Sequence, residues 1–503
     1  MASAEKRPGW RSGIVVLFGV TILILESAGK SARAMPLPQA PIVAWSEPRI
    51  AWETTGYTTN PTLITDAWGH VHLFFLSTEE TDKQNALYHA EVDNPDAEPI
   101  DVLTGVGEFR LTADPFGRIH VLALAVGNQM IHTSVNAAEA STAAAWSAGE
   151  LLGTAAPGID INAAADGSMH LCYPLEHSLA YQRSDDGGRN WTDPVLVADM
   201  VDPSGVATFV RCVSDSAGAI HVSWSEAHPP SFYPPDGVYY TLSVDGGSSW
   251  APPESIAGQH YTLPTLFADP AGLVHLLWQG DVAVGGRYYR QRAAGSTGPW
   301  GPTETVSPAG KGGMSGDAFL SSDSRGTLHV GMNVDGIYWA TRSTDWSNPV
   351  ELSASLRDLP NNSGSIERAA LAIANGNEIY VAFEFDFKRI YLLSGQSNAP
   401  EAVRTPLPDP QVNGVVTPNA QPVPTTQLPN QAGANLRLTP PLADAEIGAL
   451  MAGGTGIRQN LAAYLGASLA IAVVSLAVWH RKRPRHRRRN HKAPSPSTDS
   501  RET

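Results

Sequence analysis

A unit close to 50 residues long recurs seven times between positions 40 and 397 of this 503-residue chain. Each copy contains an Asp or Asn, then a Gly, then an apolar strand that carries a His, which the last copy replaces with Tyr. The aligned positions are His72, His120, His170, His221, His275, His329 and Tyr380. They are separated by 48, 50, 51, 54, 54 and 51 residues, which is the length of one blade of a β-propeller. The repeat therefore predicts an all-β, seven-bladed β-propeller over residues 40–397.

Each repeat is expected to form four strands. The first precedes the Asp, the second carries the His, the third is rich in aromatic residues, and the fourth begins at a Trp. Many of these strands are apolar on both alternating faces, which is typical of sheets that are covered on both sides. The seventh repeat has no Trp strand after Ser394, whereas a spare one stands at 45–50. We expect this N-terminal strand to complete the last blade, so that the ring has no open edge.

The segments that flank the repeats predict export and membrane anchoring. Residues 1–34 combine basic residues, an apolar run and a small-x-small site, the pattern of a signal peptide, with an uncleaved anchor as the alternative. Residues 398–459 are rich in Pro, Asn and Gln and predict a disordered stalk. Residues 460–480 predict a transmembrane helix, and the basic tail 481–503 marks its cytoplasmic side. The propeller is therefore expected on the extracytoplasmic side of the cell membrane.

Charge and cysteine content exclude several classes of site. Residues 35–480 hold 20 Lys or Arg against 45 Asp or Glu, which argues against nucleic acid as the partner. The chain has only two cysteines, Cys172 and Cys212, too few for a zinc site; one disulfide or two separate buried thiols are both open. A His that recurs at one structural position predicts a buried hydrogen bond rather than a metal ligand. We expect no metal and no cofactor.

Two of the predicted hairpins carry the most specific motif in the chain, Ser-x-Asp-x-Gly-x-x-Trp. Its residues are Ser184, Asp186, Gly188 and Trp191 in one copy and Ser243, Asp245, Gly247 and Trp250 in the other. The motif resembles the Asp-box, or BNR repeat, of the sialidase superfamily, and the resemblance extends over the whole repeat region. It implies a β-propeller in which the Asp-box is a structural hairpin at the periphery, where Asp binds turn amides, Gly takes positive φ and Trp packs between blades.

The resemblance is weaker for activity. Sialidases of this superfamily hold the carboxylate of the ligand with three Arg, and use a Tyr activated by Glu as nucleophile and an Asp as acid and base. The first Arg stands in an aromatic-Arg-Ile-Pro motif. The comparable stretch here has Thr59 in its place, before Asn60 and Pro61, and the repeat at 261–264 has Thr262. The chain is thus expected to be a divergent, non-catalytic member, and we assign no catalytic residue.

Three arginines remain as candidate ligand-binding residues. Arg110 and Arg211 each lie four residues before the Asp of their repeat, so they share one register in two blades, and Arg368 stands beside Glu367 on a first strand. First strands line the central funnel, so these residues are expected to converge on an anion, unless each pairs with a carboxylate of the chain. The expected function is recognition of a glycan or surface protein ligand without catalysis. A sialidase-like exo-glycoside hydrolase with a divergent site and a structural module of an envelope assembly stay open.

Overall fold

The computed structural model describes residues 43–78, 85–94, 97–228, 235–280, 285–307, 317–334, 336–357 and 366–408. The predicted signal peptide, transmembrane helix and basic tail lie outside these residues. Within the described part of the chain, no helix is long and apolar enough to cross a membrane.

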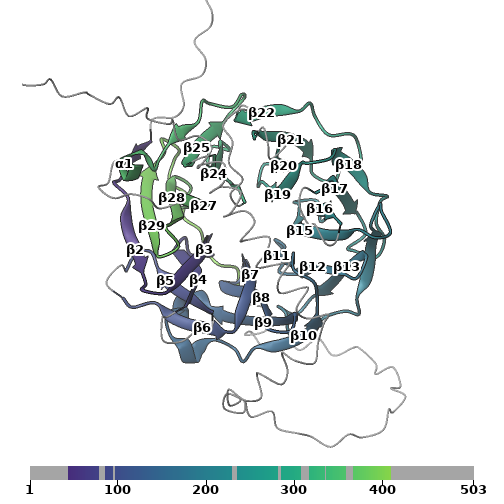
Figure 1. Cartoon of the computed structure of the whole chain (residues 1–503), viewed down its shortest axis with the longest axis horizontal. Coiled ribbons are helices and arrows are strands. Elements are labelled where there is room, and N and C mark those ends of the chain that lie inside the picture. Colours follow the sequence, from purple (N-terminus) through teal and green to yellow (C-terminus); the bar gives the residue numbers. More distant parts are fainter. Residues whose placement is uncertain are drawn as a thin grey trace, which may run out of the picture. The chain divides into compact units, whose positions relative to one another are not determined.

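Seven antiparallel sheets stand around a central axis and form a β-propeller (Figure 1). The innermost strands of blades one to seven are β3 (Tyr57–Thr65), β7 (Val106–Ala113), β11 (Asp160–Ala163), β15 (Val206–Ser214), β19 (Thr262–Ala268), β23 (Phe319–Ser322) and β27 (Ile366–Ala374). The second strands are β4 (Val71–Thr78), β8 (Arg118–Ala125), β12 (Met169–Leu175), β16 (Ile220–Ala227), β20 (Leu273–Gln279), β24 (Leu328–Asn333) and β28 (Glu378–Phe385).

The outer half of each blade contains the third and fourth strands. The third strands are β5 (Ala86–Glu91), β9 (Gln129–Asn136), β13 (Ser178–Ser184), β17 (Gly237–Ser243), β21 (Arg287–Ala293), β25 (Ile337–Arg342) and β29 (Arg389–Gln396). The fourth strands of blades one to six are β6 (Ile100–Thr104), β10 (Glu150–Thr154), β14 (Val195–Asp199), β18 (Glu254–Ala257), β22 (Glu304–Ser307) and β26 (Val350–Glu351). Three short helices accompany them, namely the 3-10 turns η1 (Ala137–Glu139) and η2 (Ala143–Ala145) and the helix α1 (Ala354–Arg357).

The N-terminal segment closes the ring, as the spare Trp strand predicted. Strands β1 (Ala44–Trp45) and β2 (Arg49–Glu53) both pair antiparallel with β29, with Trp45 opposite Gly395. The Trp45 ring also meets Trp339 of blade six edge-on, at 5.4 Å between centroids. Blade seven thus joins both ends of the repeat region, so each blade has two neighbours and no sheet edge faces an open gap in the ring.

The Trp residues occupy a different place from the one predicted. Trp191 lies before β14 rather than at its start, and its Nε1 donates to the Gly188 carbonyl at 3.1 Å. Its ring meets His132 of the preceding blade edge-on at 5.7 Å. The Trp therefore belongs to the hairpin connection, where it packs between blades, and the fourth strand begins only after the chain has left that contact.

Hydrophobic clusters fill the spaces between neighbouring blades. Strand β16 is buried along its whole length, because blades pack against both of its faces. Cys172 of blade three and Cys212 of blade four lie in one such cluster, and both are buried, unbonded thiols in this structure. The two side chains are in hydrogen-bond contact with each other, so the thiols are neighbours that no disulfide joins in this structure.

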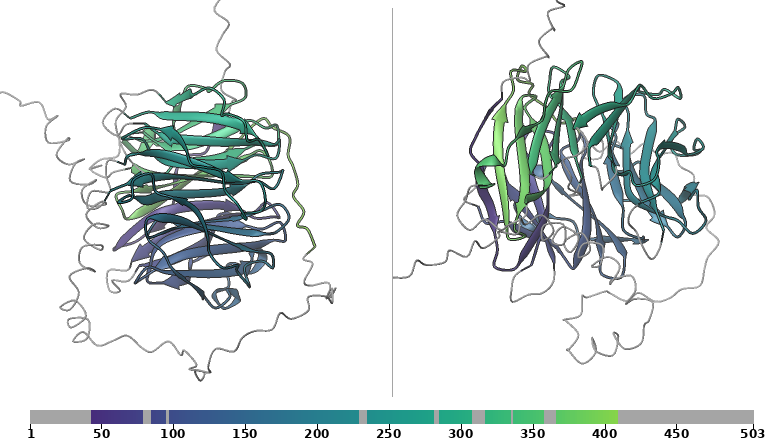
Figure 2. Two further views of the ribbon diagram at one scale, coloured as in Figure 1. Left: turned by 90° about the vertical axis from the view of Figure 1, so that its right-hand side faces the viewer. Right: turned by 45° about the horizontal axis from the view of Figure 1, so that its top comes forward.

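The segment after β29 lies on the face that carries the Asp/Gly turns. The Ala402 amide donates to the Asn375 carbonyl of blade seven, and the Leu407 amide donates at 2.8 Å to the Pro115 carbonyl of blade two. Figure 2 shows this segment running along one face of the propeller. Residues 398–408, predicted as the start of the stalk, are thus held against the turn face.

The recurring His forms the predicted buried hydrogen bond. In blade four, Asp215 Oδ2 lies 2.9 Å from His221 Nε2, and His221 Nδ1 lies 2.6 Å from Tyr240 Oη. Blades one, two, five and six repeat the Asp–His contact, and blade three inserts Ser168 between Asp166 and His170. The pattern links the turn after the first strand to the second and third strands. It stabilises the blade and leaves both His nitrogens occupied.

Two third-strand histidines, His89 and His132, contact the recurring His72 and His120 and predict acid sensitivity. Burial, and then nearby positive charge, lowers the pKa of His89 and of His132 to about 3, from an ordinary value of 6.5. Between these values the unfolded chain binds protons that the folded chain does not, so acid favours unfolding. We expect the free energy of unfolding to fall from pH 6.5 downward, by up to about 1.4 kcal/mol per pH unit for each histidine. Denaturant unfolding of the full chain across this range checks it, and a flat profile would contradict it.

Candidate ligand site at the axis of the propeller

The two faces of the ring differ in what they carry. The turns between first and second strands and the Asp-box hairpins between third and fourth strands lie on one face, because the strands alternate in direction. First strands begin at the opposite face. The three predicted arginines lie on first strands around the axis, Arg368 near the start of β27 and Arg110 and Arg211 near the middle of β7 and β15. We call the charged residues that meet there the axial cluster, which comprises Glu108, Arg110, Asp160, Arg211, Arg287, Asp317, Arg368 and Glu384.

Arg110 and Arg211 converge on one carboxylate, Asp317, which comes from a different blade. Arg211 Nη2 lies 2.5 Å from Asp317 Oδ2, and Arg110 Nη2 lies 3.8 Å from the same oxygen. Arg110 also approaches Glu108 at 3.4 Å and Asp160 at 3.9 Å. The shared register of the two arginines thus does bring them together, but the anion between them belongs to the chain itself.

Arg368 has its own partners in blades seven and one. Its Nε lies 3.5 Å from Glu384 Oε2, and its guanidinium donates to the side-chain oxygen of Asn60. Thr59 donates to the same Glu384 oxygen at 2.5 Å. Thr59, which stands where a sialidase has Arg, is therefore buried against a carboxylate. Glu367 pairs with Glu384 across β27 and β28, and its side chain lies outside the described residues.

The pKa values of two carboxyl groups in the axial cluster, Asp317 and Asp160, are shifted in opposite directions. Burial raises the pKa of Asp317, but Arg211, Arg110, Arg287 and Arg368 together hold it below its usual value. Burial raises the pKa of Asp160 above its usual value in spite of Arg211 and Arg110, although Asp160 accepts a hydrogen bond from the Cys212 amide at 2.7 Å. Four guanidinium groups thus meet four carboxyl groups, and the cluster is close to neutral overall.

The first strands are irregular at the same level of the axis. Four of them carry a β-bulge whose inserted residue has positive φ, namely Asn60 (φ 55°), Phe209 (φ 52°), Leu263 (φ 52°) and Arg368 (φ 55°). Residues other than glycine adopt this conformation at a cost, and bulges that re-aim side chains are common at functional sites. The bulges turn the chain next to the axial cluster in four of the seven blades.

One repeat position supplies most of the residues that the sequence analysis missed. It lies six residues before the Asp of the repeat and is occupied in blades one, two, four, five and six by Asn60, Glu108, Phe209, Leu263 and Asp317. In blade three the turn begins at Ala164, so Asp160 pairs with Cys172 at the level at which Arg211 pairs with Ser223. Arg110 and Arg211 lie two residues further along their strands, whereas Arg368 is itself the bulge residue of blade seven. The register that selected Arg110 and Arg211 therefore contained the signal for their acidic partners as well.

Two Tyr–Glu hydrogen bonds of the described residues lie away from the axial cluster. Tyr338 donates to Glu351 at 3.2 Å between the third and fourth strands of blade six, in the outer half of the blade. Tyr380 lies 3.5 Å from Glu378, at the end of β28 nearest the turn face. Neither pair is beside the arginines of the axial cluster.

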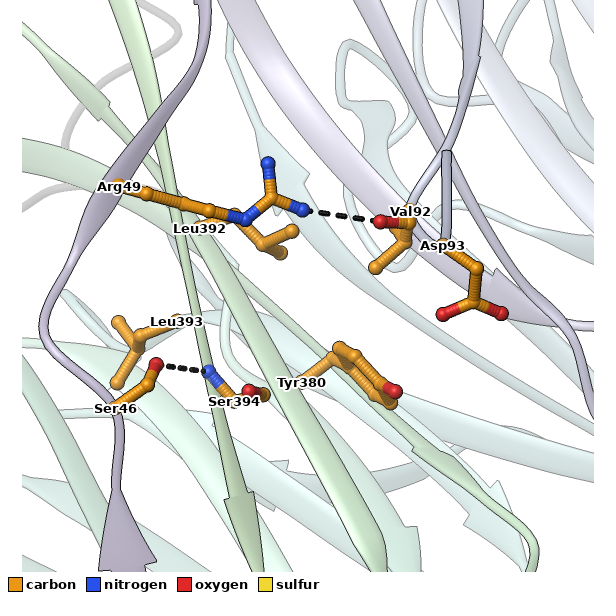
Figure 3. A pocket seen from close by; sticks show the side chains of 8 residues that line it. All are labelled: Ser46, Arg49, Val92, Asp93, Tyr380, Leu392, Leu393 and Ser394. Atoms are coloured by element: carbon orange, nitrogen blue, oxygen red, sulfur yellow. Dashed lines mark hydrogen bonds between the residues drawn. The ribbon is translucent and has the colours of Figure 1, made fainter. Parts of the chain in front are cut away.

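A separate pocket of about 210 Å³ lies at the seam between the closing strand and blade one (Figure 3). Arg49 crosses it and donates to the Val92 carbonyl at 3.0 Å, while the Ser394 amide donates to Ser46 at 3.0 Å. Burial, and then Asp93, raises the pKa of the Tyr380 that lines it to about 12. These contacts hold the seam closed, so we assign the pocket to ring closure.

No model of a protein family matches the chain, and no curated protein matches it. Solved structures similar to it include a protein of unknown function from Dyadobacter fermentans, 14% identical with a TM-score of 0.46, over 71% of this chain and 99% of that one. The fold is an all-β, seven-bladed β-propeller. Also similar is a Hadza microbial sialidase, 15% identical with a TM-score of 0.39, over 69% of this chain and 68% of that one. The NanB sialidase from Streptococcus pneumoniae is 14% identical with a TM-score of 0.37, over 72% of this chain and 71% of that one. These are likenesses of fold alone.

Proposed function

We propose that the chain is a membrane-anchored, extracytoplasmic propeller that recognises a neutral, hydroxyl-rich ligand, a glycan or a glycan-bearing surface protein, without catalysis. The observation that carries the proposal is that Arg110 and Arg211 already share the carboxylate of Asp317. An anionic ligand would have to displace that carboxylate and would meet three further carboxyl groups. The residues therefore favour a ligand without a net charge.

Hydroxyl groups suit such a cluster because each can donate and accept. A sugar hydroxyl can donate to Asp317 or Glu384 while it accepts from a neighbouring guanidinium. Hydrogen bonds to charged groups are about twice as strong as neutral ones, so a few of them orient a polyol. The guanidinium donors and carboxylate acceptors around the axis thus match the hydroxyl groups of a neutral sugar.

Two observations support recognition without catalysis. Two hydrogen-bonded Tyr–Glu pairs lie in the outer half of blade six and at the turn end of blade seven, away from the arginines. Thr59 replaces the first arginine of the sialidase motif and is engaged with Glu384. Tyr needs a neighbouring base to become a nucleophile, and these contacts provide none at the axis.

The direction of the site agrees with the proposed anchor. The described chain reaches residue 408 on the turn face, where Leu407 binds Pro115. The proposed stalk and membrane helix follow from there. The axial cluster lies toward the opposite face, so it would be presented away from the membrane.

Glycoside hydrolysis is the second candidate, and one observation favours it. Arg110 contacts both Asp160, whose pKa is raised, and Asp317, whose pKa is lowered. Two carboxyls with separated pKa values are how glycosidases obtain one proton donor and one ionised partner. The experiment below therefore includes an assay for turnover.

A glycan array probed with the purified full chain in detergent tests the proposal. We expect binding to neutral glycans, a loss of signal in Arg211→Ala, and an unchanged signal in Arg183→Ala, whose ion pair with Asp185 lies at an exposed hairpin. We expect no release of fluorophore from sialosides or neutral glycosides. Release that Asp160→Asn abolishes would establish the hydrolase instead, and an array without any neutral hit would refute the proposed recognition.

A further inference from the structure

We infer that Phe209 is the platform on which the ligand stacks a pyranose ring, which makes the ligand a glycan with one exposed C–H face. The inference rests on the proposed function and adds the apolar half of the site. Phe209 stands in the first strand of blade four, two residues before Arg211 and six before Asp215. It occupies the same repeat position as Glu108 and Asp317 of the axial cluster, so the register places it at their level of the axis.

Exposure and backbone conformation make Phe209 unusual. Its side chain is 37% exposed, whereas Leu263, at the same position of blade five and with the same φ of 52°, is 4% exposed. Burial of Leu263 offsets the cost of its left-handed backbone. Phe209, which is 37% exposed, has less of this compensation, and glycine would fit its backbone at less cost. A strained, exposed aromatic residue beside a polar cluster indicates a functional role rather than a packing role.

Neighbouring blades fix the position of the Phe209 bulge. Gly158 of blade three has φ 113°, and a Cβ there would lie 3.3 Å from the Phe209 amide nitrogen and 3.5 Å from Thr208 Cα. The Gly158 amide donates at 2.9 Å to Glu108 Oε2, and Glu108 contacts Arg110. The bulge is thus tied through Gly158 to the charged residues of blade two. A platform held in this way loses little freedom when a ligand binds.

The chemistry of the surroundings identifies the ligand class. A pyranose ring has an apolar face of C–H groups and a rim of hydroxyl groups. An aromatic face binds the C–H groups by apolar contact, and the neighbouring guanidinium and carboxyl groups bind the hydroxyl groups. Binding sites commonly combine an apolar wall with a few placed polar groups in this way. A peptide or a free anion would use only one of these two parts of the site, the aromatic face or the charged groups.

Saturation-transfer NMR of the full chain in detergent tests the inference, with the methyl glycosides of glucose, galactose and mannose as probes. Phe209→Gly is expected to bind the recognised glycoside about tenfold more weakly or worse, while its melting temperature stays the same or rises, because glycine relieves the left-handed backbone. Phe209→Trp is expected to retain binding. Leu263→Gly is the matched control, since it shares the backbone conformation but is buried, and it should melt earlier than the wild type.

The outcomes separate the two proposals. Equal binding by the wild type and Phe209→Gly, or a Phe209→Gly protein that melts as early as Leu263→Gly, would overturn the role of Phe209 and leave the proposed function standing. A wild type that shows no transfer to any of these glycosides and no neutral hit on the array would overturn both. Weak binding in Phe209→Gly together with unimpaired folding establishes the platform.

Discussion

Replacing Asp317 by alanine is expected to lower the free energy of unfolding by about 3 kcal/mol and to create a site for small carboxylates. The side chain of Asp317 is 23% exposed and lies against Arg211 and Arg110. Its removal leaves two guanidinium groups facing each other without the anion between them. The same two groups then resemble a carboxylate clamp, because a bidentate arginine fork fits a carboxylate.

Thermal unfolding of Asp317→Ala in sodium acetate, compared with sodium chloride at equal ionic strength, measures both effects. Acetate should raise the melting temperature of the variant and leave that of the wild type unchanged. The control is Asp185→Ala, whose side chain is 71% exposed and pairs with Arg183. An exposed pair contributes about 0–1 kcal/mol, so this variant should melt almost normally and ignore acetate. An Asp317→Ala protein as stable as the wild type would show that the arginines do not depend on Asp317.

Most of the fold was predictable because a propeller repeats one local pattern. The spacing of the recurring His fixed the number of blades, since each copy marks the same turn between the first and second strands. The spare Trp at position 45 predicted the closure, because a ring leaves a missing fourth strand in one place only. Trp45 does lie in β1, beside Trp339 of blade six. The ends of the strands were less predictable, as the Trp before β14 shows. The residues that pack the hairpin lie next to those that pair in the strand, so the sequence pattern does not separate them.

The candidate site was predicted in part. Register selected Arg110 and Arg211, which pair with Leu122 and Ser223 at corresponding places of their second strands. It did not reveal that Asp317 of blade six reaches between them, because the partner lies 106 residues from Arg211 and only the closed ring brings the two together. A comparison of the position six residues before each repeat Asp would have found Glu108 and Asp160.

Phe209 carried no signal of its own in the sequence. One phenylalanine among many apolar residues of a strand is expected to lie in the hydrophobic core. The neighbouring residues in the sequence do not indicate that its φ is positive. The bulge arises where β15 meets β16 with a shift between Thr208 and Arg211, while Gly158 of the preceding blade packs against it. Backbone conformation at this position is therefore a property of the assembled blades rather than of the segment.

Replacing Asp215 by alanine is expected to cost about 3–5 kcal/mol of unfolding free energy, the largest effect of any single substitution proposed for this chain. Its Oδ1 accepts from the amides of Ala217 and Ala219, both at 2.9 Å. Its Oδ2 contacts His221 at 2.9 Å and accepts from the Gly295 amide of blade five at 2.6 Å. Burial opposes ionisation, but these donors hold the pKa of Asp215 at about 2.

Urea unfolding compares Asp215→Ala with Asn375→Ala, a substitution in the corresponding turn of blade seven. Asn375 donates to Glu378 at 3.2 Å, and Tyr380 stands where the other blades have His. No charged Asp–His contact exists there, so Asn375→Ala should cost only about 1 kcal/mol. Similar losses in both variants would contradict a special role for the Asp–His pair. The buried carboxylate of Asp215 binds the turn, the second strand and the next blade. A much larger loss of unfolding free energy at Asp215 would mean that this residue couples the folding of one blade to that of its neighbour.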